Sequence, residues 1–583
     1  MEFLPFKEFT EEAGNLIRRA LEELKIDAEP ILETPPSGIA DLALPTYPLI
    51  PIARQMKIED ITGLLYKKIN ELLNKLGRGW IKEVERKGVY LNFQIDQAKL
   101  TKKTLEEVLS SGETYGNLSP KKETILLEHT SANPSGPLHI GRARNPIIGD
   151  TLVRILRAAG YEVNAQFYVD DVGKQVAILT WATRNLSEES LPPCSRDKPG
   201  YRLVRYYQKA SQLMLGQERV AEGINELVRS FENVEEKSLA EAKRSYQPVL
   251  DGVLESLEKI NVGFNSFAHE SAMIKSGLTQ EVIGKLKQSS FAGHEDSAWY
   301  LELKEFGIKG KDTKFYFTRR DGTSLYTTRD IAYHLWKAGQ ADHLINVLGE
   351  DHKLEARQVE IALDLLKVKR KPKTVFYAFV SLAEGRMSTR KGRVVYLDDL
   401  IDEAVALAYQ EVKKRRGKDL SETQLREIAE LVGIGAIRYN IVKVQPEKAI
   451  RFKWEEALNF DGDSAPFIQY AHARCRSILK KAGNSVRIGN PNYTLLSHPM
   501  ETALVKKIAR FPELVKTMAE NNRPNLMAGY AFELATLLNQ FYRDCRVVSS
   551  GKFEAPRLEL VKAVAQTLKN SLALLGISAP DYM

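Results

Sequence analysis

The chain has 583 residues, which is too long for one compact domain and suggests about three or four. With 43% hydrophobic and 27% charged residues, its composition is that of a globular protein and excludes general disorder. The formal net charge of +8 fits either a solvated surface or a polyanionic partner held by local basic patches, such as the run 413–418.

The positions of the cysteines and the hydropathy of the chain argue against several further classes of protein. The three cysteines, Cys194, Cys475 and Cys545, are far apart and form no C-x-x-C pair, which argues against a disulfide framework or a cysteine zinc site. The sequence has no apolar run of about 18 residues, so no membrane span is expected. The start of the chain lacks the basic and apolar regions of a secretory signal. We therefore expect a cytoplasmic protein.

Residues 1–118 are predicted to form a small α+β domain. Apolar residues recur at helical spacing over 9–24 and 61–76, whereas residues 88–95 alternate as in a strand. A linking helix is expected at 101–110.

Residues 119–400 are predicted to form an α/β domain of the doubly wound, Rossmann-like type. The expected order is a strand, a loop, a long helix with a possible kink at Pro146, and a second strand, and it opens a parallel sheet. The same alternation returns near the end of the region. The expected elements are a strand at 124–129, a helix at 139–159, and strands at 163–169, 344–348 and 374–380, with a helix at 353–366. A charged, mostly helical stretch at about 185–295 is interpreted as an insertion.

Residues 401–583 show no convincing strand pattern. Helical spacing over 421–432, 465–481 and 527–543 predicts a separate all-α domain.

A first motif joins the first strand of the α/β domain to its first helix. Residues 128–142 read Glu-His-Thr-Ser-Ala-Asn-Pro-Ser-Gly-Pro-Leu-His-Ile-Gly-Arg. In a doubly wound fold this loop lies at the carboxyl end of a strand, where ligands bind. Gly141 permits close approach of a nucleotide, and a helix start favours phosphate. Alone, such an H-x-G pattern is more often an ordinary turn with one capping histidine.

A second motif follows the last strand. Residues 385–392 read Gly-Arg-Met-Ser-Thr-Arg-Lys-Gly, a short loop with three cations. Such a loop suits a polyphosphate whose charge grows during reaction. Alone, a solvated basic turn explains it better.

In this order, about 250 residues apart, the two motifs resemble the H-I-G-H and K-M-S-K-S signatures of class I aminoacyl-tRNA synthetases. Four further segments are similar to the arginyl-tRNA synthetases in particular. These segments are Phe-Tyr-Val-Asp-Asp-Val-Gly-Lys-Gln (167–175), Leu-Tyr-Thr-Thr-Arg-Asp (325–330), Asp-Gly-Asp-Ser-Ala-Pro-Phe-Ile-Gln-Tyr-Ala-His-Ala-Arg (461–474) and Leu-Gly-Ile-Ser-Ala-Pro-Asp-Tyr-Met (575–583).

The resemblance implies a ligase that activates L-arginine with ATP and Mg²⁺ and transfers it to the 3′-terminal adenosine of tRNA(Arg). It further implies a monomer whose N-terminal and C-terminal domains hold the tRNA, and an arginine activation that can depend on bound tRNA. Tyr470, His472, Arg474 and Arg476 are candidate RNA contacts.

The resemblance also assigns the arginine pocket. Glu128 and Asp330 would hold the guanidinium, with Tyr326 as a neutral acceptor and Asn133 at the amino-acid end. Carboxylates suit this cation because they accept its hydrogen bonds in bidentate geometry. Tyr326 and Asp330 are four residues apart at a predicted helix start, so they share one face.

For the nucleotide and the chemistry, the resemblance implies a larger set. His139, Gly141 and Arg142 would act in catalysis with Arg390 and Lys391, the likeliest cations for the leaving pyrophosphate. The strand tip 349–352 is placed for ribose or adenine, although Asp351 would equally suit a helix cap. The residues expected to bind ATP are Ser131, Pro137, His139, Gly141, Gly349, Glu350, Asp351, His352, Met387 and Ser388. No metal cluster is visible.

Two positions depart from the family pattern. Arg142 replaces the last histidine of the first signature, and Thr389 replaces the second lysine of the second, without a compensating lysine at 135–136. Arg390 or Lys391 is expected to stabilise the transition state, with Arg386 and Arg142 in reserve. The departures alone favour a non-catalytic RNA-binding paralogue. A class I synthetase for another amino acid is a further alternative, but no cysteine–histidine zinc cluster or large editing insertion is present.

Overall fold

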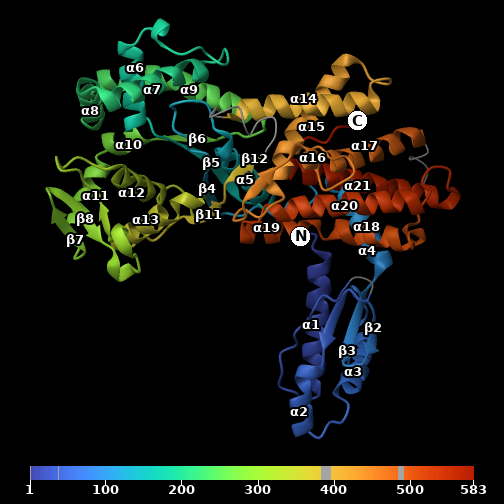
Figure 1. Ribbon diagram of the computed structural model, residues 1–583. Coiled ribbons are helices and arrows are strands. Elements are labelled where there is room, and N and C mark those ends of the chain that lie inside the picture. Colours follow the sequence, from blue (N-terminus) through green and yellow to red (C-terminus); the bar gives the residue numbers. More distant parts are fainter. Residues whose placement is uncertain (1, 37–38, 383–394, 484–490) are drawn as a thin grey trace.

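The computed structural model describes residues 2–36, 39–382, 395–483 and 491–583. A slender N-terminal lobe extends away from a central sheet, and groups of helices lie on both sides of that sheet (Figure 1). The basic loop 385–392 lies outside the described residues.

The N-terminal lobe is a three-stranded antiparallel sheet, ordered β1-β3-β2, with helices beside it. Its first helix begins at Pro5, four residues before the predicted start, because proline is favourable in a first turn. The prediction missed β2, which carries buried residues only at Ile81 and Val84. The elements are α1 (Pro5–Glu23), β1 (Leu42–Pro45), α2 (Ile50–Gln55), α3 (Ile61–Leu76), β2 (Ile81–Lys87), β3 (Tyr90–Ile95) and α4 (Gln97–Ser111).

The central sheet has five parallel strands in the order β11-β10-β4-β5-β6. From β4 the chain runs outward to β5 and β6, and it returns on the other side of β4 as β10 and β11. A crevice is therefore expected between the carboxyl ends of β4 and β10, where the strand order reverses. The elements are β4 (Thr124–Glu128), α5 (Arg144–Ala158), β5 (Glu162–Val169), β6 (Ser266–His269), β10 (His343–Gly349), α13 (Lys353–Leu365) and β11 (Lys373–Tyr377).

The predicted insertion at 185–295 is wrong in its extent. Its helices are present, but β6 lies inside that range and pairs with residues 166–169 of the central sheet. Four residues are too few to show a reliable alternation, which is why the strand was missed. The elements between β5 and β10 are α6 (Lys174–Asn185), α7 (Pro199–Gly216), α8 (Glu218–Glu232), α9 (Glu236–Lys259), α10 (Glu270–Lys275), α11 (Leu278–Lys287), β7 (Ala292–Glu295), β8 (Ala298–Glu302), β9 (Lys314–Tyr316) and α12 (Tyr326–Lys337).

The C-terminal region is helical, as predicted, with one exception. Strand β13 (Ile450–Phe452) pairs in parallel with β12 (Val380–Leu382), so the expectation of no strand after residue 400 was wrong. No helix of the described part of the chain is long and apolar enough to cross a membrane. The helices are α14 (Leu397–Arg416), α15 (Glu422–Val442), α16 (Trp454–Ala457), α17 (Ala465–Ala482), α18 (Pro499–Ala509), α19 (Phe511–Asn521), α20 (Asn525–Asp544) and α21 (Glu554–Leu574).

Candidate active site

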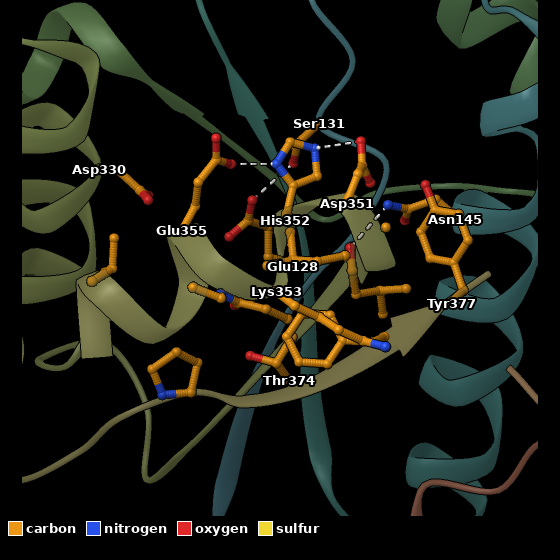
Figure 2. A pocket seen from close by; sticks show the side chains of 18 of the residues that line it. Glu128, Ser131, Asn145, Asp330, Asp351, His352, Lys353, Glu355, Thr374 and Tyr377 are labelled. Carbon is orange, nitrogen blue, oxygen red and sulfur yellow. Dashed lines mark hydrogen bonds and ion pairs between the residues drawn. The ribbon is translucent and has the colours of Figure 1, made fainter. Parts of the chain in front are cut away.

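A cavity of about 540 Å³ opens at the carboxyl ends of β4 and β10, where the strand order reverses (Figure 2). Residues of α12, α13 and β11 complete its walls. The sequence-predicted residues that line it are Glu128, Ser131, Asn133, Arg142, Asp330, Gly349, Asp351 and His352. The predicted residues Pro137, His139, Gly141, Tyr326 and Glu350 are not part of this lining.

The loop after β4 has an unusual backbone. Thr130 and Ser131 have φ angles of 71° and 42°, a region that non-glycine residues rarely adopt. Asn145 of α5 holds this turn, because its Oδ1 accepts from the Thr130 N–H at 2.7 Å and its Nδ2 donates to the Val347 carbonyl at 2.9 Å. The side-chain amide of Asn145 thus links the loop to β10. Unfavourable backbone conformations that are held in place by such contacts are typical of ligand sites.

The first motif continues into a short 3₁₀ helix, η3 (Ile140–Arg142), before α5 begins at Arg144. The predicted helix start at 139 was therefore wrong, and Pro146 lies in the first turn, where it causes no kink. The Gly141 N–H donates to His139 Nδ1 at 3.0 Å, and a Cβ at position 141 would meet this nitrogen at 3.0 Å. Desolvation and the charge of Arg142 lower the pKa of His139, so a neutral ring is favoured.

The described residues that flank the basic loop lie beside the first motif. The Ile140 N–H donates to the Val395 carbonyl at 3.1 Å, and the Leu397 N–H donates to the Leu138 carbonyl at 2.8 Å. Strand β12, which ends where the basic loop begins, contacts η3. Both described ends of that loop therefore lie beside the first motif. Residues Arg386, Met387, Ser388, Thr389, Arg390 and Lys391 themselves lie outside the described part of the chain, and their roles stay predictions.

On one wall of the cavity, Glu128 is buried at the end of β4. Its Oε2 accepts from Lys337 Nζ at 2.7 Å, and its Oε1 accepts from the Ser131 hydroxyl at 3.0 Å. Although burial alone would raise it, the pKa of Glu128 is held below its ordinary value by the charge of Lys337. Glu128 is therefore a carboxylate that already has a cationic partner.

Asp330 belongs to the same wall of the cavity and lies at its opening, on the second turn of α12 (Figure 2). Its side chain is 44% exposed, and its Oδ1 lies 3.1 Å from His334 Nδ1. Tyr326, one turn earlier, is 61% exposed and so is not the core aromatic that an isolated tyrosine suggests. Its role in binding arginine stays a prediction.

The opposite wall carries a half-exposed charge cluster. His352 Nδ1 lies 2.6 Å from Glu355 Oε2, and its Nε2 lies 3.6 Å from Asp351 (Figure 2). The hydrogen bond with Glu355 raises the pKa of His352, which favours a positive charge between two carboxylates. Asp351 does not cap α13, because the cap position is His352. Glu350 lies outside the cavity, 4.0 Å from Lys353 Nζ.

Several cavity residues were missed from the sequence. Asn145 and Tyr377 lie at one end, and His334 and Asn346 join Lys337 behind Glu128. One signal was visible, because Asp330, His334 and Lys337 are spaced four and three residues apart and so share one face of α12. Within the described ranges, no group of three or more His, Cys, Asp or Glu could hold a metal ion.

The surface of the C-terminal helices offers a second candidate site. The Arg474 guanidinium lies over the rings of Tyr470 and Tyr542, at 4.9 Å and 5.3 Å from their centroids. Both rings are exposed, so they are available for stacking. His472 is not available, because it is buried with Nδ1 at 2.9 Å from the Pro580 carbonyl. Arg476 pairs with Asp581.

Comparison with known families defines the class. A family model described as tRNA synthetases class I (R), catalytic domain, matches residues 104–454, and a DALR anticodon binding domain model matches residues 468–583. A parallel sheet with a nucleotide-type crevice and a helical domain behind it therefore has the organisation of a class I aminoacyl-tRNA synthetase.

Individual relatives narrow the class to one family. The chain is 46% identical over 514 residues to an arginine–tRNA ligase of Methanocella arvoryzae, covering 88% of this chain and 90% of the relative. It is 41% identical to the ligase of Methanothermobacter thermautotrophicus over 99% and 100% of the two chains. The structure of Thermus thermophilus arginyl-tRNA synthetase superposes with a TM-score of 0.79 at 26% identity, covering 98% of this chain and all of that one. The chain belongs to the arginyl-tRNA synthetase family, which confirms the predicted fold class and ligase function.

Proposed function

We propose that this chain joins L-arginine to tRNA(Arg), and that the cavity between β4 and β10 is where arginine meets ATP. The observation that carries this proposal is the position of Asp330. Its half-exposed carboxylate lines the same cavity as Glu128, and the strand tip with Asp351 and His352 lies opposite. A guanidinium fits the first pair and a nucleotide fits the second.

The reaction has two steps, and neither needs a covalent enzyme intermediate. The arginine carboxylate attacks the α-phosphorus of ATP and releases pyrophosphate. The 2′ hydroxyl of the terminal adenosine of the tRNA then attacks the carbonyl carbon of arginyl adenylate and releases AMP. The protein contributes position and compensating charge. Asp330 and Glu128 hold the guanidinium with Tyr326 as a neutral acceptor beside them, and Asn133 orients the amino-acid end.

Cations supply the compensating charge. Arg142 lines the cavity, and among the described residues it makes no ion pair, so its charge is free for a phosphate. His139 lies on the same 3₁₀ turn, and Arg390 and Lys391 belong to the loop whose ends flank this turn. Mg²⁺ normally binds through few carboxylates plus phosphate oxygens, which fits a wall with Asp351 and no three-residue cluster in the described ranges. It would supply charge neutralisation of the phosphates.

The helical C-terminal region is proposed to read the anticodon of the tRNA through the Tyr470–Arg474–Tyr542 stack. The N-terminal lobe, which extends from the body, is proposed to reach another part of the same tRNA (Figure 1). We expect a monomer that acts in the cytoplasm.

The test is charging of tRNA with each labelled amino acid in ATP and Mg²⁺, with the wild type, Asp330→Ala and Asp364→Ala. Asp364 is a half-exposed aspartate of α13 that pairs with Lys371, so it is a matched control. We expect arginine alone to be charged, and Asp330→Ala to lose at least about 100-fold in kcat/KM. If a folded wild type charges no amino acid on competent tRNA, the proposal fails and an RNA-binding role takes its place.

A further inference from the structure

Behind the proposed arginine pocket lies a buried chain of polar side chains that joins its two carboxylates. Lys337, the last residue of α12, is fully buried, and its Nζ donates both to Glu128 and to Asn346 Oδ1. Asn346 Nδ2 lies 2.9 Å from His334 Nε2, and His334 Nδ1 lies 3.1 Å from Asp330 Oδ1. The path runs from Glu128 to Asp330 through three side chains that do not themselves come from the first motif.

Hydrogen-bond chemistry fixes every orientation along this path. An ammonium has donors and no acceptor, so the Asn346 atom that faces Lys337 must be the amide oxygen. The amide nitrogen then faces His334 and donates to Nε2, which must carry a lone pair. The ring proton therefore sits on Nδ1, which faces the carboxylate of Asp330 and also its backbone carbonyl at 2.8 Å. Although burial alone would lower it, the charge of Asp330 raises the pKa of His334; the Asn346 N–H nevertheless occupies Nε2 while Lys337 is charged, so the neutral ring is favoured.

The charges of the pocket then add up to a simple total. Glu128 contributes one negative charge and Lys337 one positive charge, His334 is neutral, and Asp330 contributes one negative charge. Lys337 Nζ also lies 5.0 Å from the centroid of the Tyr333 ring. The titratable groups that interact with Glu128 are Lys337, His334, Tyr333 and the adjacent His129.

We propose that Lys337, Asn346 and His334 are positioning residues that leave Asp330 as the one uncompensated negative charge offered to the guanidinium. Glu128 still offers free lone pairs to arginine, but its charge is already balanced. A singly charged substrate then makes the closed pocket neutral, whereas two unbalanced carboxylates in an apolar wall would hold a proton between them. This inference rests on the proposed function and identifies what sets the charge selectivity of that site.

The central test compares Lys337→Met with the charge-neutral double variant Glu128→Gln/Lys337→Met. Without Lys337, burial should keep Glu128 protonated near neutral pH, so the pocket keeps its single negative charge and the KM for arginine stays within about 5-fold of the wild type. As pH increases and Glu128 ionises, the pocket gains a second negative charge and this KM should fall by about 10-fold, a step that the wild type lacks. In the double variant this pH dependence is absent, and the KM stays within about 5-fold of the wild type at each pH.

Lys285→Met is the matched control, because Lys285 makes a similar 2.6 Å contact with Glu281 on the exposed face of α11. It should leave KM unchanged. A pH-independent KM in Lys337→Met, or the same pH dependence in the double variant, would overturn the proposal.

Asn346→Asp tests the path should Lys337→Met fold poorly. It keeps an acceptor for Lys337 but places a second acceptor against His334, so His334 takes up a proton that balances the new carboxylate. We expect the KM for arginine to stay within about 5-fold of the wild type at pH 7 and to fall as pH increases and His334 loses this proton, because the pocket then gains a negative charge. A KM as independent of pH as that of the wild type would contradict the path through Asn346.

Calorimetric binding of arginine to the same variants separates this inference from the proposed function. A wild type that binds arginine but charges no tRNA contradicts the ligase role alone. Arginine affinities that respond equally to pH in the wild type, Lys337→Met and Asn346→Asp contradict the positioning role alone.

Discussion

Glu128 and Asp351 are carboxylates in the same cavity, yet their surroundings are opposite. Glu128 is 8% exposed and hydrogen-bonded to Lys337 and Ser131, whereas the side chain of Asp351 is 50% exposed and its partner His352 is 3.6 Å away. The same contrast extends to their neighbours, since Asn346 is buried and Arg142 is exposed. The guanidinium of arginine keeps its charge throughout the reaction, whereas charge moves at the phosphates of ATP as pyrophosphate leaves. The buried, hydrogen-bonded wall around Glu128, called the fixed wall from here on, therefore suits the amino acid. The exposed wall around Asp351, called the adjustable wall, suits the nucleotide.

The fixed wall should be the more sensitive to loss of one amide. Asn145→Ala removes the partner of both the Thr130 N–H and the Val347 carbonyl, and leaves two buried backbone groups unpaired. We expect kcat/KM for arginine charging to fall about 100-fold and the free energy of unfolding to fall by about 2 kcal/mol. Asn70→Ala, which removes an amide bond to the Tyr66 carbonyl in the N-terminal lobe, is the control. If the two changes had equal effects, the fixed wall would be no more sensitive to the loss of an amide than the N-terminal lobe.

Substitutions in the adjustable wall should mainly lower kcat. Arg142→Ala removes a cavity-lining cation that we propose faces the phosphates, and it leaves Glu128 and Asp330 in place. We therefore expect kcat to fall about 30-fold while the KM for arginine changes less than about 3-fold. Arg142→Lys should restore most of the rate, because a point charge suffices for a phosphate. Pre-steady-state adenylate formation measures both variants. A rise in the arginine KM instead would mean that the two walls are not separate.

Low pH should destabilise the folded chain at the fixed wall, because His129, the residue after Glu128, is buried and binds a proton more readily in the unfolded chain. Burial lowers the pKa of His129 to about 4, below its ordinary value of 6.5. The folded chain therefore binds fewer protons than the unfolded chain between these values, and stability is lost as pH falls from 6.5 towards 4, by at most about 1.4 kcal/mol per pH unit. His129→Phe keeps the stacking on Phe264 without the titration. Its melting temperature should fall less over this interval, and an equal fall would assign the loss elsewhere.

The smallest effect is expected at Glu355, at the rim of the adjustable wall. Glu355→Gln replaces the carboxylate that raises the pKa of His352 with a neutral amide, so less of the ring is charged at pH 7.5. We expect the KM for ATP to rise about 3-fold at pH 7.5 and the difference to shrink near pH 5.5, where His352 is protonated in both proteins. Glu281→Gln, paired with Lys285 on α11 and outside the cavity lining, is the control. A difference that grows on acidification would contradict this assignment.

The same contrast explains which residues could be predicted from the sequence. Strands and helices with long periodic patterns, such as β5 and α17, were found close to their observed limits. The three- and four-residue strands β13 and β6 were missed, because their pairing depends on partners far along the chain. Glu128, Asp330 and Asp351 were found because motifs carry them. Lys337 and Asn346 were not, because a buried lysine is recognisable only once its carboxylate partner is known to lie opposite.

Arg144 bears on how this chain could be divided. Its buried guanidinium donates to the carbonyls of Ala378, Gln445 and Lys448, beyond the end of β11 and after α15. A fragment ending near residue 400, where the helical region was expected to begin, would leave that guanidinium without its acceptors at Gln445 and Lys448. The catalytic half of this protein is therefore not a detachable module at that point. A stable excised piece must carry the next 50 or so residues with it, through β13, as the span of the catalytic-domain match to residue 454 already suggests.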